Sequence, residues 1–519
     1  MKLHTPMKLG FKLLGMTVSG KKKGCLKRTS ITHKVTKKGA LKGGAKKSGI
    51  RKKGVIVAMA KKGRRYSTPS KTTRRKESIV TQYFSDSTDS SPPTPQASTT
   101  VASSTRVHRP GPPPKVMPFE ICTYGESKGF GKLAKKFDTP LYCYSYLKLK
   151  NNIINFKNHF KKINPLICFS VKSNSNIKIL REIKNLDCGA DVVSMGEMMK
   201  VLKAGINIKK IVFSGVGKTY SELEYAINKN ILLINVESRS ELLVVEKIGK
   251  LKKKKIDIGI RLNPNINAKT LQQISTGKKE DKFGVSEKEF LKLVKYTKLS
   301  KFLKLKCLSV HIGSQIFNHK PYEKMLKVID RLIKQSNHKF EFIDLGGGMG
   351  ISYEKNNKKL NFKIYNSLIN KFLKKNSCKI IFEPGRSIIG NTGILISKII
   401  YIKKNKNKNF VILDAAMNDF MRPALYGTKH QIIPSIKNKK EENKIFEFVG
   451  PICESTDKFL STNKFQTLKE GDVIIICDVG AYGISLASNY NVRPLPMEIL
   501  IKNSKIHIIK NRQKLSDII

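Results

Sequence analysis

A lysine at the end of a short apolar run is the first residue whose position suggests chemistry. Residues 166–171 are predicted to form a buried strand, and Lys172 follows them directly, with small polar residues after it. The primary amine of a lysine can form a covalent imine with an aldehyde, including the aldehyde of a cofactor. A lone lysine after an apolar run is also typical of a strand that ends at the protein surface, so a chemical role for Lys172 depends on the motifs that accompany it.

Two motifs farther along the chain could complete a site around such a cofactor. His311 follows another apolar run and offers a flat imidazole that can lie against a pyridine ring, and Ser314 offers a hydroxyl group to a phosphate. Gly346, Gly347 and Gly348 remove side chains where a strand is predicted to meet a helix. Backbone N–H groups can approach an anion there, although a tight turn would explain the three glycines as well.

The motif Glu383-Pro384-Gly385-Arg386 lies at the end of the last predicted strand of this series. A carboxylate such as Glu383 can pair with a protonated pyridine nitrogen and keep the ring an electron sink, and Arg386 can bind a carboxylate through two hydrogen bonds. A structural ion pair in a turn is the alternative for this motif taken alone. Together and in this order, the lysine, the histidine, the glycines and this motif predict a pyridoxal phosphate site.

Three motifs near the C-terminus carry further candidate groups. Cys453 and Glu454 place a thiol, which can donate a proton, beside a carboxylate, which can receive an ammonium group. A buried structural cysteine is the alternative for Cys453. Arg422, which begins a motif that ends at Tyr426, offers a second arginine for a second carboxylate, and Tyr482 offers a phenol to the phosphate.

These residues need a scaffold that brings the ends of several strands together. Eight strand-like runs alternate with stretches of helical periodicity, such as residues 197–204 and 221–229. The runs are residues 167–171, 190–194, 211–214, 232–236, 256–262, 308–312, 342–345 and 380–382. Eight such units over about 240 residues predict a (β/α)8 barrel of the TIM type, in which sites form at the C-terminal ends of the strands. The candidate residues from Lys172 to Arg386 fall at those ends.

Composition divides the chain into four predicted parts. Residues 1–116 are rich in basic residues and in Ser, Thr and Pro, and we expect a disordered extension because they cannot bury enough apolar surface to order. Residues 117–150 contain a strand near 141 that we expect to join the β domain. Residues 151–393 form the predicted cofactor-binding barrel. Residues 394–519 predict a C-terminal all-β domain, because turn signals separate six longer strand-like runs: residues 394–402, 409–413, 445–450, 472–479, 497–501 and 505–509.

The net charge of +63 is distributed unevenly. Residues 1–80 hold 25 Lys and Arg against one acid, which gives +24, whereas +38 is spread over the 404 residues from 116 onward. We interpret most of the charge as compositional drift rather than as a binding surface. Nucleic-acid binding through residues 1–80, an organellar transit segment, and a start at Met117 remain open alternatives for the extension.

The nine cysteines are scattered and include no CxxC pair. This pattern argues against a disulfide framework and against a metal site, and it favours a reducing compartment. No apolar run approaches the roughly 20 residues of a membrane span. We therefore expect a cytoplasmic protein with no membrane association, or an organellar one if residues 1–116 are a transit segment.

From about residue 118 to 515, the chain resembles the diaminopimelate decarboxylases, which belong to the alanine-racemase-like, fold type III pyridoxal phosphate enzymes. Besides the motifs above, the matching stretches are Thr139-Pro140-Leu141-Tyr142, Val171-Lys172-Ser173-Asn174, residues 189–194, 213–219, 261–264, 276–277, 282–284 and 311–315. Ser173 stands where the family usually has alanine, and Met195 interrupts a usual Ser-Gly-Gly-Glu. The 116-residue extension has no counterpart in the family.

The resemblance implies a role for each candidate residue. Lys172 would bind the cofactor covalently, His311 would stack on it, and Cys453 would protonate the carbon that has lost carbon dioxide. The remaining cofactor-binding residues would be Ser314, Gly346, Gly347, Gly348, Glu383, Pro384, Gly385, Arg386 and Tyr482. The substrate would be bound by Arg386, Arg422, Tyr426, Glu454 and Tyr482. The family also implies a homodimer with shared active sites, in which Cys453 and Glu454 reach into the partner's barrel.

The implied reaction converts meso-2,6-diaminopimelate to L-lysine and carbon dioxide, the last step of lysine biosynthesis by the diaminopimelate pathway. Arg422 and Glu454 would recognise the distal amino-acid end, because burying either charge unpaired is costly. Decarboxylases of this group that act on ornithine, arginine or carboxynorspermidine tend to carry Asp where Glu454 stands. A racemase would carry a tyrosine base instead of Cys453, and a non-catalytic pyridoxal phosphate carrier usually lacks the β domain.

Overall fold

The computed structural model describes residues 128–519, apart from 269–272, 274–275, 354–358 and 438–439. The predictions made for residues 1–116, including nucleic-acid binding through residues 1–80, therefore lie outside the described residues. No helix among the described residues is both long enough and apolar enough to cross a membrane.

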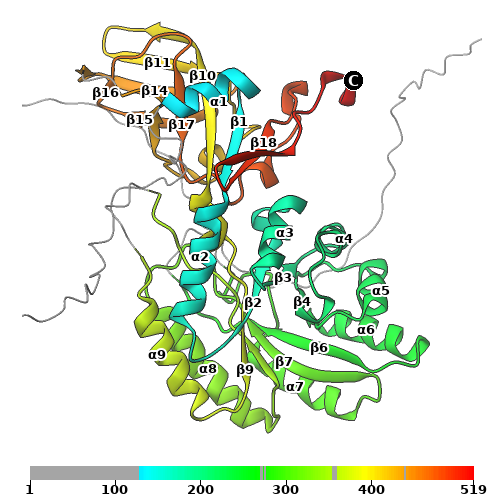
Figure 1. The fold of residues 1–519 in the computed structure, drawn as a ribbon. Helices are drawn as coiled ribbons and strands as arrows, with labels where there is room; N and C mark the ends of the chain where they lie inside the picture. Colours follow the sequence, from blue (N-terminus) through cyan, green and yellow to red (C-terminus); the bar gives the residue numbers. More distant parts are fainter. Residues whose placement is uncertain (1–127, 269–272, 274–275, 354–358, 438–439) are drawn as a thin grey trace, which may run out of the picture. The chain divides into compact units, whose positions relative to one another are not determined.

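The predicted barrel is confirmed, since eight parallel strands close into a barrel in chain order (Figure 1). These strands are β2 (Leu166–Ser170), β3 (Gly189–Val192), β4 (Ile211–Phe213), β5 (Leu233–Val236), β6 (Ile256–Leu262), β7 (Leu303–Val310), β8 (Phe342–Asp344) and β9 (Lys379–Phe382). All eight predicted runs coincide with them. Strand β7 begins at Leu303, earlier than predicted. Its first residues alternate between buried and exposed positions, so they do not form a continuous apolar run in the sequence.

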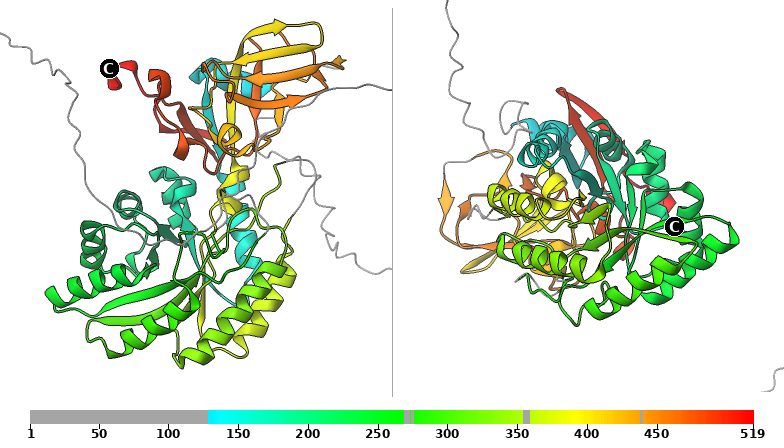
Figure 2. Two further views of the ribbon diagram at one scale, coloured as in Figure 1. Left: turned by 180° about the vertical axis from the view of Figure 1, so that it is seen from behind. Right: turned by 90° about the horizontal axis from the view of Figure 1, so that it is seen from below.

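Amphipathic helices cover the outside of the barrel (Figure 2). They are α3 (Ile177–Asn185), α4 (Met195–Ala204), α5 (Tyr220–Lys229), α6 (Arg239–Leu251), α7 (Glu287–Leu299), α8 (Lys320–Ser336) and α9 (Phe362–Leu373). Their starts are encoded locally, because Ser194 caps α4 through the backbone N–H of Glu197, and Thr219 and Glu222 form a capping box on α5.

A helix that precedes the barrel in the chain also packs against it. Helix α2 (Tyr146–His159) places the Phe156 ring 5.5 Å from that of Phe382 in β9. Asn152 of α2 donates a hydrogen bond to the backbone carbonyl of Ile388 in the single-turn helix α10 (Arg386–Ile389), at 2.8 Å. Because α10 is too short to cover β9, α2 takes the place that a helix after the last strand would otherwise fill.

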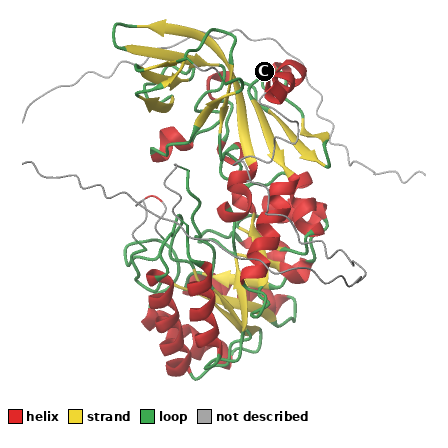
Figure 3. Ribbon diagram, turned by 60° about the vertical axis from the view of Figure 1, so that its left-hand side comes forward, coloured by secondary structure: helices red, strands yellow, loops and turns green. Residues whose placement is uncertain are grey.

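The second sheet contains strands from both ends of the described chain (Figure 1), and Figure 3 shows these strands in yellow, apart from those of the barrel. Its strands are β1 (Leu141–Ser145), β10 (Gly393–Lys404), β11 (Lys408–Leu413), β12 (Ile432–Pro434), β14 (Ile445–Val449), β15 (Lys458–Thr462), β17 (Val473–Ile476), β18 (Met497–Lys502) and β19 (Lys505–Lys510). Strand β1 lies between β10, to which it is antiparallel, and β18, to which it is parallel. Helix α1 (Lys128–Phe137) packs Phe130 and Leu133 onto this sheet.

The six strands predicted for the C-terminal domain are all present, but four others and two helices were missed. The missed strands are β12, β15, β13 (Glu441–Glu442) and β16 (Phe465–Gln466), of which the last two pair only with each other. The missed helices are α1 and α11 (Arg422–Tyr426). The missed strands are two to five residues long, and each contains a polar or charged residue or proline, so their sequences show little apolar pattern.

The barrel interior changes from apolar to polar along the direction of its strands. Cys168, Val212, Leu233, Cys307, Phe342 and Ile381 form one apolar cluster. The residue two positions later on each of these strands is polar: Ser170, Ser214, Asn235, Ser309, Asp344 and Glu383. Side chains repeat with a period of two along a strand, so both sets point into the barrel. The strands thus close their N-terminal end with a dry core and line their C-terminal end with hydrogen-bonding groups.

Candidate active site

A pocket at the C-terminal end of the barrel collects most of the residues that the sequence predicted for the cofactor. Its lining consists of Ser170, Lys172, His311, Ser314, Gly348, Met349, Glu383, Gly385, Arg386 and Tyr482. About 360 Å³ of empty space, counted up to its opening, lies among them. Tyr482 comes from the β domain, so the pocket needs both the barrel and the sheet that carries β1.

Lys172 is held in position by contacts of its neighbours on both sides of the pocket. It lies in a single 3₁₀ turn, Val171–Ser173, directly after β2. The backbone N–H of Tyr482 donates to the carbonyl of Ser173 at 2.8 Å, and the Ser173 hydroxyl donates to the carbonyl of Ser170 at 2.7 Å. The lysine backbone is therefore fixed, while its side chain, 42% exposed, extends into the pocket.

Asp191 is the charged partner of this lysine, and the sequence analysis did not single it out. Its Oδ2 atom lies 3.3 Å from Nζ of Lys172 and accepts a hydrogen bond from the Ser170 hydroxyl at 2.8 Å. Burial lowers the pKa of Lys172, but the negative charge of Asp191, with smaller effects of Tyr482 and Glu383, outweighs burial and raises it. The lysine without a covalent partner is therefore an ammonium group.

The glycine turn after β8 lies against His311. The backbone N–H of Gly347 donates to Nδ1 of His311 at 3.1 Å, which fixes the plane of the imidazole. Burial lowers the pKa of His311 well below its usual value, and the positive charges of Arg261 and Lys172 lower it further, so the ring is neutral. Gly346 has φ of +61°, and a Cβ atom there would lie 2.5 Å from Nδ1 of His311. Glycine is therefore required for the turn to approach the imidazole.

Glu383 lies among other buried carboxyl groups. Ser214 donates to its Oε1 at 3.3 Å. Burial raises the pKa of Glu383 well above its usual value, and the charges of Asp191 and Asp344 raise it further. Asp344 has more donors, since it accepts hydrogen bonds from the Ser309 hydroxyl at 2.9 Å and the Asn235 amide at 3.0 Å. Glu383 is thus the carboxyl group of this cluster that holds a proton.

Two buried arginines lie without a carboxylate partner among the described residues. Arg386 donates to the Ser314 hydroxyl at 3.1 Å and lies 4.8 Å from the centre of the Tyr482 ring. Arg422, 2% exposed, begins α11 and lies 5.6 Å from the centre of the Tyr426 ring. The Nε atom of each arginine is buried and has no hydrogen-bond partner in the described part of the chain. Because an isolated buried charge is costly, the pair is suited to an anionic ligand.

The structure does not bring Cys453 and Glu454 into this pocket. Both lie exposed in the loop between β14 and β15, and neither lines the pocket. Glu454 accepts hydrogen bonds from the Tyr490 hydroxyl at 2.5 Å and from the Thr456 hydroxyl at 3.2 Å. The Glu454 carboxylate is thus held on the surface of its own chain.

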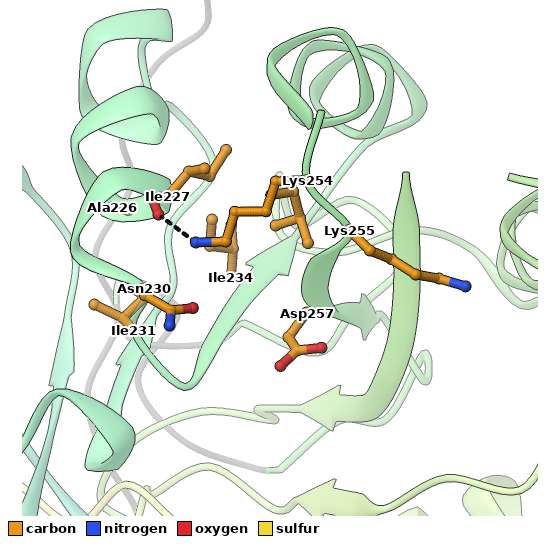
Figure 4. Close-up of a pocket in the computed structure, with 9 residues that line it drawn as sticks. Ala226, Ile227, Asn230, Ile231, Ile234, Lys254, Lys255 and Asp257 are labelled. Carbon is orange, nitrogen blue, oxygen red and sulfur yellow. Dashed lines mark hydrogen bonds between the residues drawn. The ribbon is translucent and has the colours of Figure 1, made fainter. Parts of the chain in front are cut away.

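A second pocket lies at the opposite, N-terminal ends of β5 and β6 (Figure 4). The ammonium group of Lys254 donates to the carbonyl of Ile227 at 3.3 Å, and Asp257 forms an ion pair with Lys306 at 2.8 Å. These polar groups therefore have partners within the chain. None of the candidate residues lies in this pocket.

The chain matches known proteins over most of the part that the structure describes. Residues 147–390 match the family model "Pyridoxal-dependent decarboxylase, pyridoxal binding domain". The diaminopimelate decarboxylase of Helicobacter pylori is 44% identical over 393 residues, which are 75% of this chain and 96% of that protein. The chain belongs to the diaminopimelate decarboxylase family. Its relative from Aquifex aeolicus is 37% identical over 391 residues, or 75% of this chain and 92% of that protein.

Solved structures of the diaminopimelate decarboxylase family share the fold. The crystal structure of the enzyme from Helicobacter pylori, complexed with L-lysine, has a TM-score of 0.71 at 43% identity and covers 75% of this chain and 98% of that one. The structure of the M. jannaschii protein in co-complex with L-lysine has a TM-score of 0.71 at 35% identity, with 75% and 92% covered. A lysine decarboxylase from Selenomonas ruminantium, at 22% identity, shows the fold alone.

Proposed function

We propose that this chain is a pyridoxal phosphate-dependent carboxy-lyase that converts meso-2,6-diaminopimelate to L-lysine and carbon dioxide, as the last step of lysine biosynthesis. One observation carries the substrate assignment. The buried guanidinium group of Arg386 lines the pocket that contains Lys172, and Tyr353 connects it to a second buried guanidinium group, of Arg422. Neither arginine has a carboxylate partner in the described residues. A substrate with a second carboxylate can supply the missing charge, whereas ornithine, arginine and carboxynorspermidine have no distal amino-acid end.

The residues of the pocket fit pyridoxal phosphate. Lys172 is the amine that would bind its aldehyde, and His311 is neutral and flat, as a ring that lies against the cofactor should be. A Cβ atom at Gly347 would lie 2.2 Å from the Glu383 carbonyl oxygen, so the turn has no room for a side chain there. A phosphate at this turn would therefore meet backbone N–H groups. The phosphate would be held by Gly346, Gly347, Gly348, Ser314, Gly385, Arg386 and Tyr482, with Pro384 shaping the turn. Bound pyridoxal phosphate supplies a sink for the electron pair that carbon dioxide leaves behind.

The chain's own residues control the protons and charges around this chemistry. Glu383 holds a proton, and its carboxyl group would face the pyridine nitrogen of bound pyridoxal phosphate, where this proton would keep the ring electron-withdrawing. Asp191 stabilises Lys172 as an ammonium group whenever the lysine is not covalently bound. Arg386, Arg422 and Tyr426 bind the distal carboxylate of the substrate, so the reacting end is oriented by the end that does not react.

Cys453 and Glu454 act from a second copy of the chain. The Glu454 carboxylate receives the distal ammonium group of the substrate. The Cys453 thiol donates its proton to the carbon that has lost carbon dioxide, so an S–H bond breaks and a C–H bond forms with the electron pair of the former C–C bond. Water then returns a proton to the sulfur. The support for a homodimer is that both residues are exposed and lie outside the pocket of their own chain.

The reaction is tested with the purified full-length chain loaded with pyridoxal phosphate. We expect L-lysine and carbon dioxide from meso-diaminopimelate, and no turnover of ornithine, arginine or carboxynorspermidine. Lys172→Ala should be inactive because it lacks the amine that binds the cofactor. Turnover of one of the other substrates would reassign the specificity, and cofactor binding without any turnover would favour a carrier.

The shared site is tested by mixing two inactive variants, Lys172→Ala and Cys453→Ala. In a mixed dimer one of the two pockets combines an intact Lys172 with an intact Cys453 from the other chain. Random exchange of subunits should therefore restore about a quarter of the wild-type activity. A mixture that stays inactive, although native mass spectrometry shows mixed dimers, would place both residues in one chain's site.

The remaining assignments concern location and the N-terminal part. We propose a cytoplasmic enzyme, supported by the free state of the cysteines in the described part, and an organellar one if residues 1–116 direct import. We also propose that the boundaries between the four parts of the chain lie at residues 116, 150 and 393. Salt-sensitive retention on DNA that disappears when residues 1–116 are deleted would add nucleic-acid binding to the enzyme.

A further inference from the structure

A tyrosine that the sequence analysis did not assign contacts both buried arginines. Tyr353 follows the glycine turn and is 9% exposed. Nη1 of Arg386 donates a hydrogen bond to its phenolic oxygen at 2.5 Å, and the guanidinium group of Arg422 lies 5.1 Å from the centre of its ring. One side chain thus connects two groups that lie far apart in the sequence and that both lack a carboxylate partner in the described residues.

The hydrogen bond with Arg386 determines what the phenol can still do. A guanidinium group only donates, so the phenolic oxygen is the acceptor and its own hydrogen is left to donate. No acceptor for that hydrogen is present among the described residues. A phenol polarised by a positive charge in a buried site is a stronger donor, and hydrogen bonds to charged acceptors are the stronger ones. An anion held by the two arginines would be the partner that this O–H group lacks.

The Tyr353 ring packs against a second aromatic ring, that of His430. Its centre lies 4.4 Å from that of the His430 ring, which in turn packs edge-on against Phe420 at 4.7 Å. Nδ1 of His430 lies 2.8 Å from the backbone carbonyl of Cys477, which fixes the imidazole. Burial, together with the nearby Arg422, lowers the pKa of His430 to about 3, so the ring supports Tyr353 without adding positive charge.

We propose that Tyr353 is a further specificity-determining residue, whose phenol donates a hydrogen bond to the distal carboxylate of the substrate while Arg386 and Arg422 neutralise its charge. The proposal rests on the proposed function and adds a further donor to the carboxylate site. It also explains why a bulky tyrosine is buried between two positive groups, because its oxygen and its ring face stabilise the arginines while the site is free. L-Lysine, the product, keeps this carboxylate and can report on it without any reaction.

The test compares L-lysine with cadaverine, which is lysine without its carboxylate, by calorimetric titration of the full-length enzyme loaded with cofactor. Tyr353→Phe keeps the ring and removes only the hydroxyl group. We expect it to weaken binding of L-lysine about ten-fold, as the loss of a hydrogen bond to a charged group should, and to change cadaverine binding less than about two-fold. Tyr296 lies on α7, and its hydroxyl group is hydrogen-bonded to Glu246 on α6. Tyr296→Phe is therefore the matched control and should change the binding of neither ligand.

Each other outcome has its own meaning. Equal weakening of both ligands would overturn the inference, because it would show a general structural role, and so would unchanged binding of both. If Tyr353→Phe does not fold, Tyr353→Met must show the same selective loss. A wild-type enzyme that does not prefer L-lysine to cadaverine would instead refute the proposed substrate, because the arginines would then not bind a carboxylate.

Discussion

The glycine turn provides a sharp test of the site, through the substitution Gly347→Ala. A Cβ atom at this position would lie 2.2 Å from the carbonyl oxygen and 3.1 Å from the carbonyl carbon of Glu383. Carbon atoms in contact ordinarily lie about 3.5 Å or more apart, so the turn after β8 and the end of β9 would have to separate by roughly 1 Å. Both neighbours are backbone atoms, so no flexible side chain can yield.

Overpacking of this kind costs about 1 to 3 kcal/mol of unfolding free energy. It also displaces Glu383 and the N–H group that fixes His311, and a site displaced by about 1 Å loses function. We therefore expect Gly347→Ala to be destabilised by about 2 kcal/mol in urea unfolding of the cofactor-free protein. We also expect its affinity for pyridoxal phosphate, followed by visible absorbance, to fall at least about ten-fold, by the same displacement.

The matched control is Gly131→Ala in helix α1, where a Cβ atom would meet nothing within 4 Å. Alanine is the better helix former, so this variant should gain up to about 1 kcal/mol and bind cofactor normally. Wild-type stability and cofactor affinity in Gly347→Ala, measured beside a control that behaves as expected, would refute the reasoning about the turn.

Two further predictions follow from buried carboxyl groups. Glu383→Gln cannot hold an exchangeable proton, so kcat should fall about 100-fold or more with the cofactor still bound, and steady-state rates within about two-fold of wild type would contradict the role given to Glu383. Burial raises the pKa of Asp478 to about 7, whereas the same carboxyl group in the unfolded state has a pKa of about 3.9. The folded state therefore binds this proton more tightly, and the stability of the wild-type protein falls as the pH rises between these two values. Asp478→Asn should therefore match wild type at about pH 4 and exceed it by up to about 4 kcal/mol at about pH 8 in denaturant unfolding, and a difference that does not depend on pH would contradict this account.

The barrel was readable from the sequence because its strands are buried on both faces and stand out as short apolar runs between amphipathic stretches. The same runs located Lys172 and His311, which follow β2 and β7. Strands such as β12 and β15 escaped because they are short and carry proline or polar residues. The packing of α2 against β9 was not predicted for another reason. Only the tertiary structure shows that a helix before the first barrel strand covers the last one.

The site was predictable where a motif marks a strand end and less so where a single polar residue lies inside a strand. Asp191 and Asp344 belong to strands that read as ordinary apolar runs, and neither was singled out. For Asp344 the period of two along the strand was the available signal, because it lies two positions after the inward-facing Phe342. Tyr353 carried no local signal, since its partners Arg386 and Arg422 come from α10 and α11.

The position of β1 between β10 and β18 has a consequence for how the chain is made. Leu141 pairs with Ile396 and with Met497, so the strand leaves the ribosome roughly 250 residues before its first neighbour and about 350 before its second. Until β10 emerges, neither edge of β1 has a partner strand, and one edge stays unpaired until β18 emerges. The barrel can close earlier, because all of its strands lie between residues 166 and 382 and pair only with one another. We therefore expect the barrel to fold before the second sheet is complete. The unpaired edges of β1 are open to aggregation until the last strands of that sheet emerge.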